Sequence, residues 1–91
     1  MSRIGKKFEK LGGKTAFIGY ITAGDPSIET TKDLVLAMEK GGCDIIELGV
    51  PYSDPVADGP VIQVAAQRAL DNGVTVEKIF EVVEDIRKES Q

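Results

Sequence analysis

Glu47 and Asp58 are the two side chains of this sequence best suited to acid–base chemistry. Glu47 lies within the apolar run CDIIELGV at 43–50, and a run of this kind predicts a strand that is buried on both faces. A lone carboxylate in a buried strand is costly to desolvate unless it is paired or protonated. Its presence needs an explanation, and carboxylates in such perturbed settings tend to lie at functional sites.

The place of Glu47 near the end of its predicted strand also suits a site. Because side chains alternate along a strand, Glu47 shares a face with Ile45 and Gly49, and the glycine leaves space beside the carboxylate. Pro51 then begins a loop at the carboxyl end of the strand, where parallel α/β sheets and barrels bind their ligands. Two interpretations stay open: Glu47 is a functional group, or it forms an internal ion pair or caps a neighbouring loop.

The acidic residues of the following loop have simpler explanations. Asp58 precedes a Gly-Pro pair, which is typical of a helix start with an acceptor side chain ahead of the first turn, so capping would account for it. Asp54 precedes Pro55 and is most simply a turn residue. Together with Glu47 these residues could offer oxygen ligands to magnesium, but turns explain the same composition and we expect no metal site.

The elements that must position these residues follow from periodicity and from turn residues. The apolar runs at 15–22 (TAFIGYIT) and 43–50 predict two strands that begin about 30 residues apart, the size of one βαβ unit. Helices are predicted over 2–11, from a Ser27 cap to Gly41, over 62–70, and from a Thr75 cap to 86. Their expected apolar positions are Thr31, Leu34, Val35 and Met38; Ile62, Ala65, Ala66, Ala69 and Leu70; and Ile79, Phe80, Val83 and Ile86.

Composition narrows the class of protein. Fifteen acidic and eleven basic side chains give a net charge of −4 with the cations scattered, so we expect no nucleic-acid partner. No run of about 18 apolar residues could cross a membrane, and no apolar core follows the basic residues near Met1, so we expect no membrane association or export signal. Histidine is absent and Cys43 has no partner for a disulfide, which favours the reducing cytoplasm and argues against a transition-metal centre.

Three strings carry a family resemblance: GYITAGDP at 19–26, ELGVPYSDPVADGPVIQ at 47–63 and RALDNGVT at 68–75. In this order they resemble consecutive landmarks of the tryptophan synthase α chain family. The resemblance implies a (β/α)8 TIM barrel with an extra N-terminal helix. It makes residues 1–91 a single incomplete domain: the short extra helix and the first two βα units, a βαβα portion of the barrel.

The resemblance also implies a reaction and roles for residues. The family cleaves indole-3-glycerol phosphate reversibly into indole and glyceraldehyde 3-phosphate. Glu47 matches the catalytic glutamate, which acts as acid and base. Asp58 matches the catalytic aspartate, which accepts a hydrogen bond from the indole nitrogen. Tyr20 matches an active-site aromatic that contacts the substrate and is a phenylalanine in some members.

Partners follow from the same resemblance. The α chain uses no cofactor and joins a pyridoxal-phosphate β chain in a complex of two α and two β chains, with the loop that carries Pro51, Asp54 and Pro55 facing the partner. The family holds the substrate phosphate with backbone amides late in the barrel, and a complete barrel takes about 250 residues. We therefore expect a piece of a longer chain that is inactive by itself. An alternative is a fragment that associates with itself or complements another barrel piece.

Overall fold

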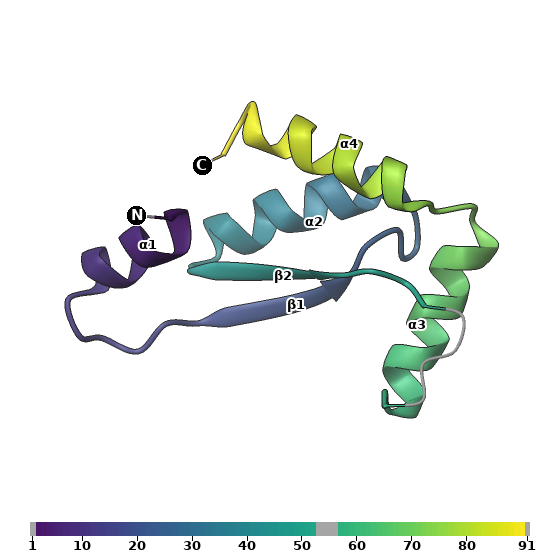
Figure 1. Ribbon diagram of the computed structural model, residues 1–91, viewed down its shortest axis with the longest axis horizontal. Coiled ribbons are helices and arrows are strands. Elements are labelled where there is room, and N and C mark those ends of the chain that lie inside the picture. The colour runs from purple at the N-terminus through teal and green to yellow at the C-terminus, as the bar shows by residue number, and fades with distance from the viewer. Residues whose placement is uncertain (1, 53–56, 91) are drawn as a thin grey trace.

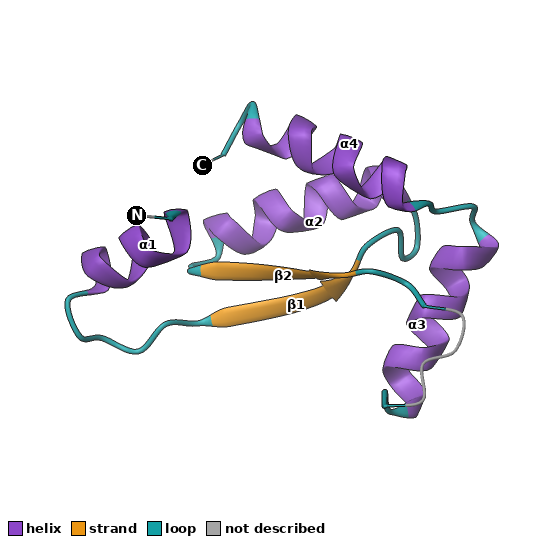
Figure 2. Ribbon diagram, viewed as in Figure 1, coloured by secondary structure: helices purple, strands orange, loops and turns teal. Residues whose placement is uncertain are grey.

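The computed structural model describes residues 2–52 and 57–90 of the chain. Six elements follow one another in the predicted order of helix, strand, helix, strand, helix and helix (Figures 1 and 2). They are α1 (Arg3–Leu11), β1 (Ile18–Thr22), α2 (Ile28–Lys40), β2 (Ile45–Gly49), α3 (Pro60–Asp71) and α4 (Val76–Arg87).

The starts of α2 and α4 lie where the sequence predicts them, because their caps are local. The Ser27 hydroxyl accepts a hydrogen bond from the Thr30 amide, and Thr75 accepts one from the Lys78 amide, which satisfies backbone donors at the first turns of α2 and α4. At the end of α1, Gly12 takes a left-handed conformation with a φ of 59°, which glycine adopts without steric cost.

The two strands pair in parallel, with Ile18 opposite Ile45, Tyr20 opposite Glu47 and Thr22 opposite Gly49. Both are shorter than the predicted runs, beginning at Ile18 and at Ile45. The predicted runs are defined by their apolar residues. A strand, by contrast, extends only as far as the two backbones lie side by side and form hydrogen bonds.

The helices cover only one face of this sheet. Val35 of α2 packs with Val82 and Ile86 of α4, and β-sheet side chains including Ile46 and Leu48 lie against this cluster. In Figure 1, α2 and α4 both lie on one side of the strands. The core is therefore a single layer between that sheet face and the helix pair.

The prediction that both strands are buried on both faces is wrong. Ile18 and Tyr20 point away from the helices, and their exposed fractions are 47% and 45%. The reason is geometric: each strand-to-strand crossover places its helix on one side of the sheet, and nothing in the described residues covers the other side.

Two helix positions also differ from the predicted core. Phe80 is 68% exposed, and Val82 takes the buried position on α4 instead. Leu34 on α2 is exposed as well, while Thr31 and Val35 are buried as predicted. Periodicity identifies an apolar stripe, but the width of the stripe that is covered depends on the neighbouring elements.

Small residues dock α3 at the carboxyl end of the sheet. Ala65, Ala66 and Ala69 are buried, and α3 contacts β1. Figure 1 shows α3 beyond the carboxyl ends of the strands. The turn after β1 approaches closely: Gly24 has a φ of 90°, and a Cβ added there would lie 2.8 Å from a methyl group of Val74. Glycine is needed at position 24 because a side chain there would meet the side chains of Val74 and Ala69.

No helix within the described ranges is long and apolar enough to cross a membrane.

Candidate functional site

Glu47 lies in the middle of β2 on the face opposite the helices. Its strand neighbours Ile46 and Leu48 point into the core, so alternation directs Glu47 to the open face. The side chain is exposed, which corrects the expectation that this carboxylate is buried. No desolvation cost has to be compensated here, because the sheet face that carries Glu47 is uncovered.

No structural partner explains Glu47. Among residues 2–52 and 57–90, no hydrogen bond or ion pair involves its carboxylate. The interpretation that Glu47 forms an internal ion pair or caps a loop is therefore not supported within the described chain. Its carboxylate is available to a ligand on the open face.

Tyr20 is the residue brought closest to Glu47 by the sheet register. It lies directly opposite Glu47 on β1, and its ring extends across β2 over the next residue of that face, Gly49. A Cβ added to Gly49 would collide with the phenol oxygen and would lie 2.9 Å from ring carbon Cε2. The space that the sequence predicts at Gly49 is thus filled by the aromatic ring of Tyr20.

Asp58 does not cap α3, contrary to the structural interpretation of the sequence. The N-cap is Gly59, the helix begins at Pro60, and no side chain caps its first turn. The backbone carbonyl of Asp58, not its carboxylate, accepts a hydrogen bond of 2.6 Å from the Gln63 side chain. Its exposed carboxylate is therefore not used for capping.

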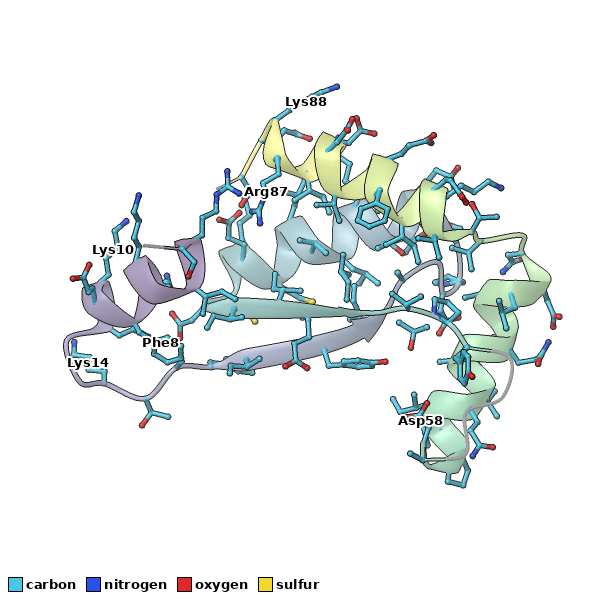
Figure 3. The ribbon with its side chains drawn as sticks, in the orientation of Figure 1. Phe8, Lys10, Lys14, Asp58, Arg87 and Lys88 are labelled. Atoms are coloured by element: carbon cyan, nitrogen blue, oxygen red, sulfur yellow. The ribbon has the colours of Figure 1, made fainter. Side chains whose placement is uncertain are left out.

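Figure 3 shows Asp58 at the beginning of α3, below the strands in that view and on the opposite side from α2 and α4. This is the side to which the open face carrying Glu47 points. The structure thus places the two predicted catalytic residues on one side of the sheet, Glu47 in the middle of β2 and Asp58 beyond the carboxyl end of that strand, without a hydrogen bond or ion pair between them among the described residues.

A bidentate ion pair helps hold α3 in this place. Arg68 of α3 donates hydrogen bonds of 2.8 and 3.0 Å to the two carboxylate oxygens of Asp25, in the turn after β1. Asn72, the C-cap of α3, donates to the carbonyl of Pro26. Because Asp58 begins α3, these contacts also fix where Asp58 lies relative to the strands.

The ion pair between Arg68 and Asp25 also lowers the pKa of Asp25. The hydrogen bonds from Arg68, and then its charge, hold the pKa of Asp25 below its ordinary value of 3.8, although partial burial raises it. A carboxyl group with a lowered folded-state pKa stabilises the fold above its unfolded pKa. That contribution is lost as the pH falls through the folded-state pKa.

We expect Asp25→Asn to lower the melting temperature at pH 7 by about 4 °C or less, because the Arg68 partner is largely solvent-exposed and screened. The difference from the unsubstituted chain should shrink as the pH falls below the ordinary value of 3.8 and be lost as the pH passes through the lowered folded-state pKa. Circular dichroism melts across this range measure it, with Asp85→Asn, which loses an exposed pair with Lys88, as the control. A constant difference at all pH values would contradict the assignment.

The remaining predicted residues belong to the loop after β2. Pro51 is half-buried directly after the strand, whereas Asp54 and Pro55 lie outside the described residues. The magnesium alternative involves Asp54 and so falls partly outside them too. Within the described ranges, no group of three or more His, Cys, Asp or Glu side chains could hold a metal ion.

Sequence reasoning missed two contacts that shape this site, Tyr20 on Gly49 and Arg68 on Asp25. Both join segments far apart in the chain. The strings at 19–26 and 68–75 do carry one signal for the second contact, an acidic residue in one and a basic residue in the other. Nothing local indicates the first.

Residues 7–91 match the family model described as tryptophan synthase alpha chain. The tryptophan synthase alpha chain of Thermoanaerobacter sp. (strain X514) is 61% identical over 92 residues, covering 99% of this chain and 35% of the relative. That of Alkaliphilus metalliredigens is 60% identical over 93 residues, again 35% of the relative. The chain thus spans about a third of the length of these relatives.

Solved structures agree. Tryptophan synthase subunit alpha from Legionella pneumophila superposes with a TM-score of 0.95 at 44% identity, covering 99% of this chain and 35% of that chain. The tryptophan synthase a2b2 complex of Pyrococcus furiosus contains a chain that matches with a TM-score of 0.78 at 43% identity, covering 82% of this chain and 30% of that chain. The predicted βαβα portion of a TIM barrel, preceded by an extra helix, is confirmed.

Proposed function

The chain belongs to the tryptophan synthase alpha chain family, whose members act in tryptophan biosynthesis, and we propose that Glu47 and Asp58 cleave indole-3-glycerol phosphate once the rest of a barrel surrounds them. Residues 1–91 would form the first two strand-helix units of that barrel as one domain. The products would be indole and glyceraldehyde 3-phosphate.

The reaction needs two proton transfers around one carbon–carbon bond. A proton must reach indole C3, a proton must leave the hydroxyl of the neighbouring glycerol carbon, and the bond between these carbons breaks to leave an aldehyde. No net oxidation occurs, so the reaction needs no redox cofactor. Glu47 would perform both transfers in turn: its carboxylic acid form gives a proton to C3, and the carboxylate that remains takes the proton of the hydroxyl, which restores the acid.

Asp58 would act on the indole ring. A carboxylate that accepts a hydrogen bond from the indole N–H increases the electron density at C3 and stabilises the positive charge that develops there on protonation. The support for this role is that Asp58 lies on the same side of the sheet as Glu47 and that its carboxylate does not cap α3.

The main observation that supports the proposal is the position of Glu47. Its carboxylate lies on the open sheet face, opposite Tyr20, and makes no hydrogen bond or ion pair with the described residues. It also lies within the segment that matches the family. An open face at the carboxyl end of parallel strands is where a barrel builds its site. Tyr20 would contact the flat indole ring there.

A growth experiment tests the proposal. We define the barrel chimera as residues 1–91 of this chain followed by the remaining part, about two thirds, of the Thermoanaerobacter sp. relative. In a bacterium that lacks its own α chain, the chimera should permit growth without tryptophan or indole. Growth only when indole is added, despite normal amounts of folded chimera, would refute the proposed cleavage activity.

A β chain is the proposed protein partner, because a similar chain of Pyrococcus furiosus is solved within an a2b2 complex. We propose that the loop beginning at Pro51 faces that partner, as the expected roles of Asp54 and Pro55 require. Loop carboxylates of this kind mainly guide association and register.

A second candidate function, association of the 91 residues with one another, is favoured by the open face. Ile18 and Tyr20 are about half exposed on the open face. Burying a large apolar side chain stabilises by about 1.5–3 kcal/mol. A two-stranded sheet also leaves strand edges open to pairing.

We expect light scattering after size-exclusion chromatography to give a mass above that of one chain, falling with dilution. Ile18→Lys, which places a charge on the open face, should shift the population toward monomer, whereas Lys14→Gln should not. A cooperative monomer at every concentration would contradict this second function and leave the catalytic proposal unaffected.

A further inference from the structure

We infer that Gly49 is a positioning residue: its missing side chain lets the Tyr20 ring lie across β2 beside Glu47, where it forms an aromatic wall for a flat heterocyclic substrate. The contact between Gly49 and Tyr20 is independent of any activity. Its catalytic consequence rests on the proposed function.

The backbone gives no reason for a glycine at position 49. Positive φ values occur at Gly12, Gly13, Gly24, Gly42 and Gly73, but not at Gly49, which lies in regular strand conformation. Glycine in a strand weakens it, since it loses more chain entropy on folding and adds no side chain to pack. Where conformation does not require glycine, close approach of another group is the remaining explanation.

The group that approaches is the Tyr20 ring. A Cβ on Gly49 would meet only atoms of Tyr20 at its three nearest contacts, namely the hydroxyl oxygen and two ring carbons. By contrast, a Cβ on Gly41 would meet backbone oxygens at 3.4 and 3.6 Å, which are ordinary contact distances. The conflict at Gly49 is therefore specific to one side chain.

The Tyr20 ring has space to move away if a side chain at position 49 occupies its present place. Its side chain is 45% exposed on the open face, so a methyl group at position 49 would drive the ring into another rotamer at small cost to the fold. Substitution of Gly49 should thus displace an aromatic group that sits beside Glu47 in the register without unfolding the sheet.

The 91-residue chain tests the contact directly by nuclear magnetic resonance. The α protons of Gly49 should carry a ring-current shift from Tyr20, and Tyr20→Leu should abolish that shift. Gly49→Ala should move the ring resonances of Tyr20 while those of Tyr52 stay in place, and Gly41→Ala should move neither. Unchanged Tyr20 resonances in folded Gly49→Ala would overturn the inference.

Kinetics of the barrel chimera test the consequence. Gly49→Ala should lower kcat/KM by about tenfold or more, because small displacements of positioning groups cost up to about 100-fold. On a Tyr20→Leu background the same substitution should cost less than about threefold, since the group that it displaces is already gone. An equal loss on both backgrounds would show that Gly49 acts through something other than Tyr20.

The two proposals fail in different ways. If the unsubstituted chimera folds but releases no indole, the proposed function is wrong, and the resonance experiment still decides whether Gly49 positions Tyr20. If the chimera is active but Gly49→Ala leaves kcat/KM unchanged, the positioning role is wrong and the assignment of Glu47 stands.

Discussion

Glu47→Gln in the barrel chimera is expected to lower the rate of indole release by about 100- to 10,000-fold, the usual contribution of a general acid or base. The amide keeps the shape of the side chain but cannot transfer a proton. The fold should not change, because the Glu47 carboxylate makes no hydrogen bond or ion pair with the described residues and lies exposed on the open face.

The control for this substitution is Glu84→Gln, which removes an exposed carboxylate from α4 on the far side of the molecule. Both variants should melt at the temperature of the parent chimera, and only Glu47→Gln should lose activity. Retention by Glu47→Gln of more than about a tenth of the parent rate would contradict the acid–base role.

Asp58→Ala in the same chimera should lower kcat/KM by about 100- to 1,000-fold, the range found when a group that stabilises developing charge is removed. Asp58→Asn should fall less far, because its amide oxygen can still accept a hydrogen bond from the indole nitrogen although it carries no charge. Stopped-flow and steady-state assays of indole release measure both.

Stability separates this role from capping. Loss of a helix N-cap typically costs about 1 kcal/mol, whereas α3 begins at Gly59 and Pro60 without a side-chain cap, so Asp58→Ala should melt like its parent. Asp71→Asn at the opposite end of α3 is the matched control and should remain active. A marked loss of stability in Asp58→Ala with unchanged catalysis would restore the capping interpretation.

Features decided by neighbouring residues could be predicted from the sequence. Ser27 and Thr75 cap the helices as expected, since a cap needs only a hydroxyl three residues before a free amide. The alternation that places Glu47 and Gly49 on one face also follows from strand geometry alone.

Features decided by packing could not be predicted. The apolar run at 43–50 predicts a strand that is buried on both faces, yet burial depends on what covers each face. Phe80 and Val82 exchange expected places for the same reason. The contact between Tyr20 and Gly49 depends on which residues of β1 and β2 lie opposite each other, and no local pattern specifies that register.

Glu47 is therefore assigned its role on a different ground from the one that the sequence suggests. Its side chain is exposed in the described chain and not buried as the sequence predicts. The Glu47 carboxylate makes no hydrogen bond or ion pair with the described residues and lies on the open side of a two-stranded sheet, opposite Tyr20. The segment that carries it matches one enzyme family. Further strands of a complete barrel would enclose Glu47, and the proposed cleavage of indole-3-glycerol phosphate depends on that enclosure.

The most direct test of this account is the rate of indole release from indole-3-glycerol phosphate by the purified barrel chimera, beside the 91-residue chain and the Thermoanaerobacter sp. parent. The chimera should reach about a tenth of the parent rate or more, and the 91-residue chain should release none, because positioning of a held substrate contributes roughly 7–11 kcal/mol. A chimera that folds and melts cooperatively but releases no indole would contradict the assignment of Glu47 and Asp58 as its catalytic pair.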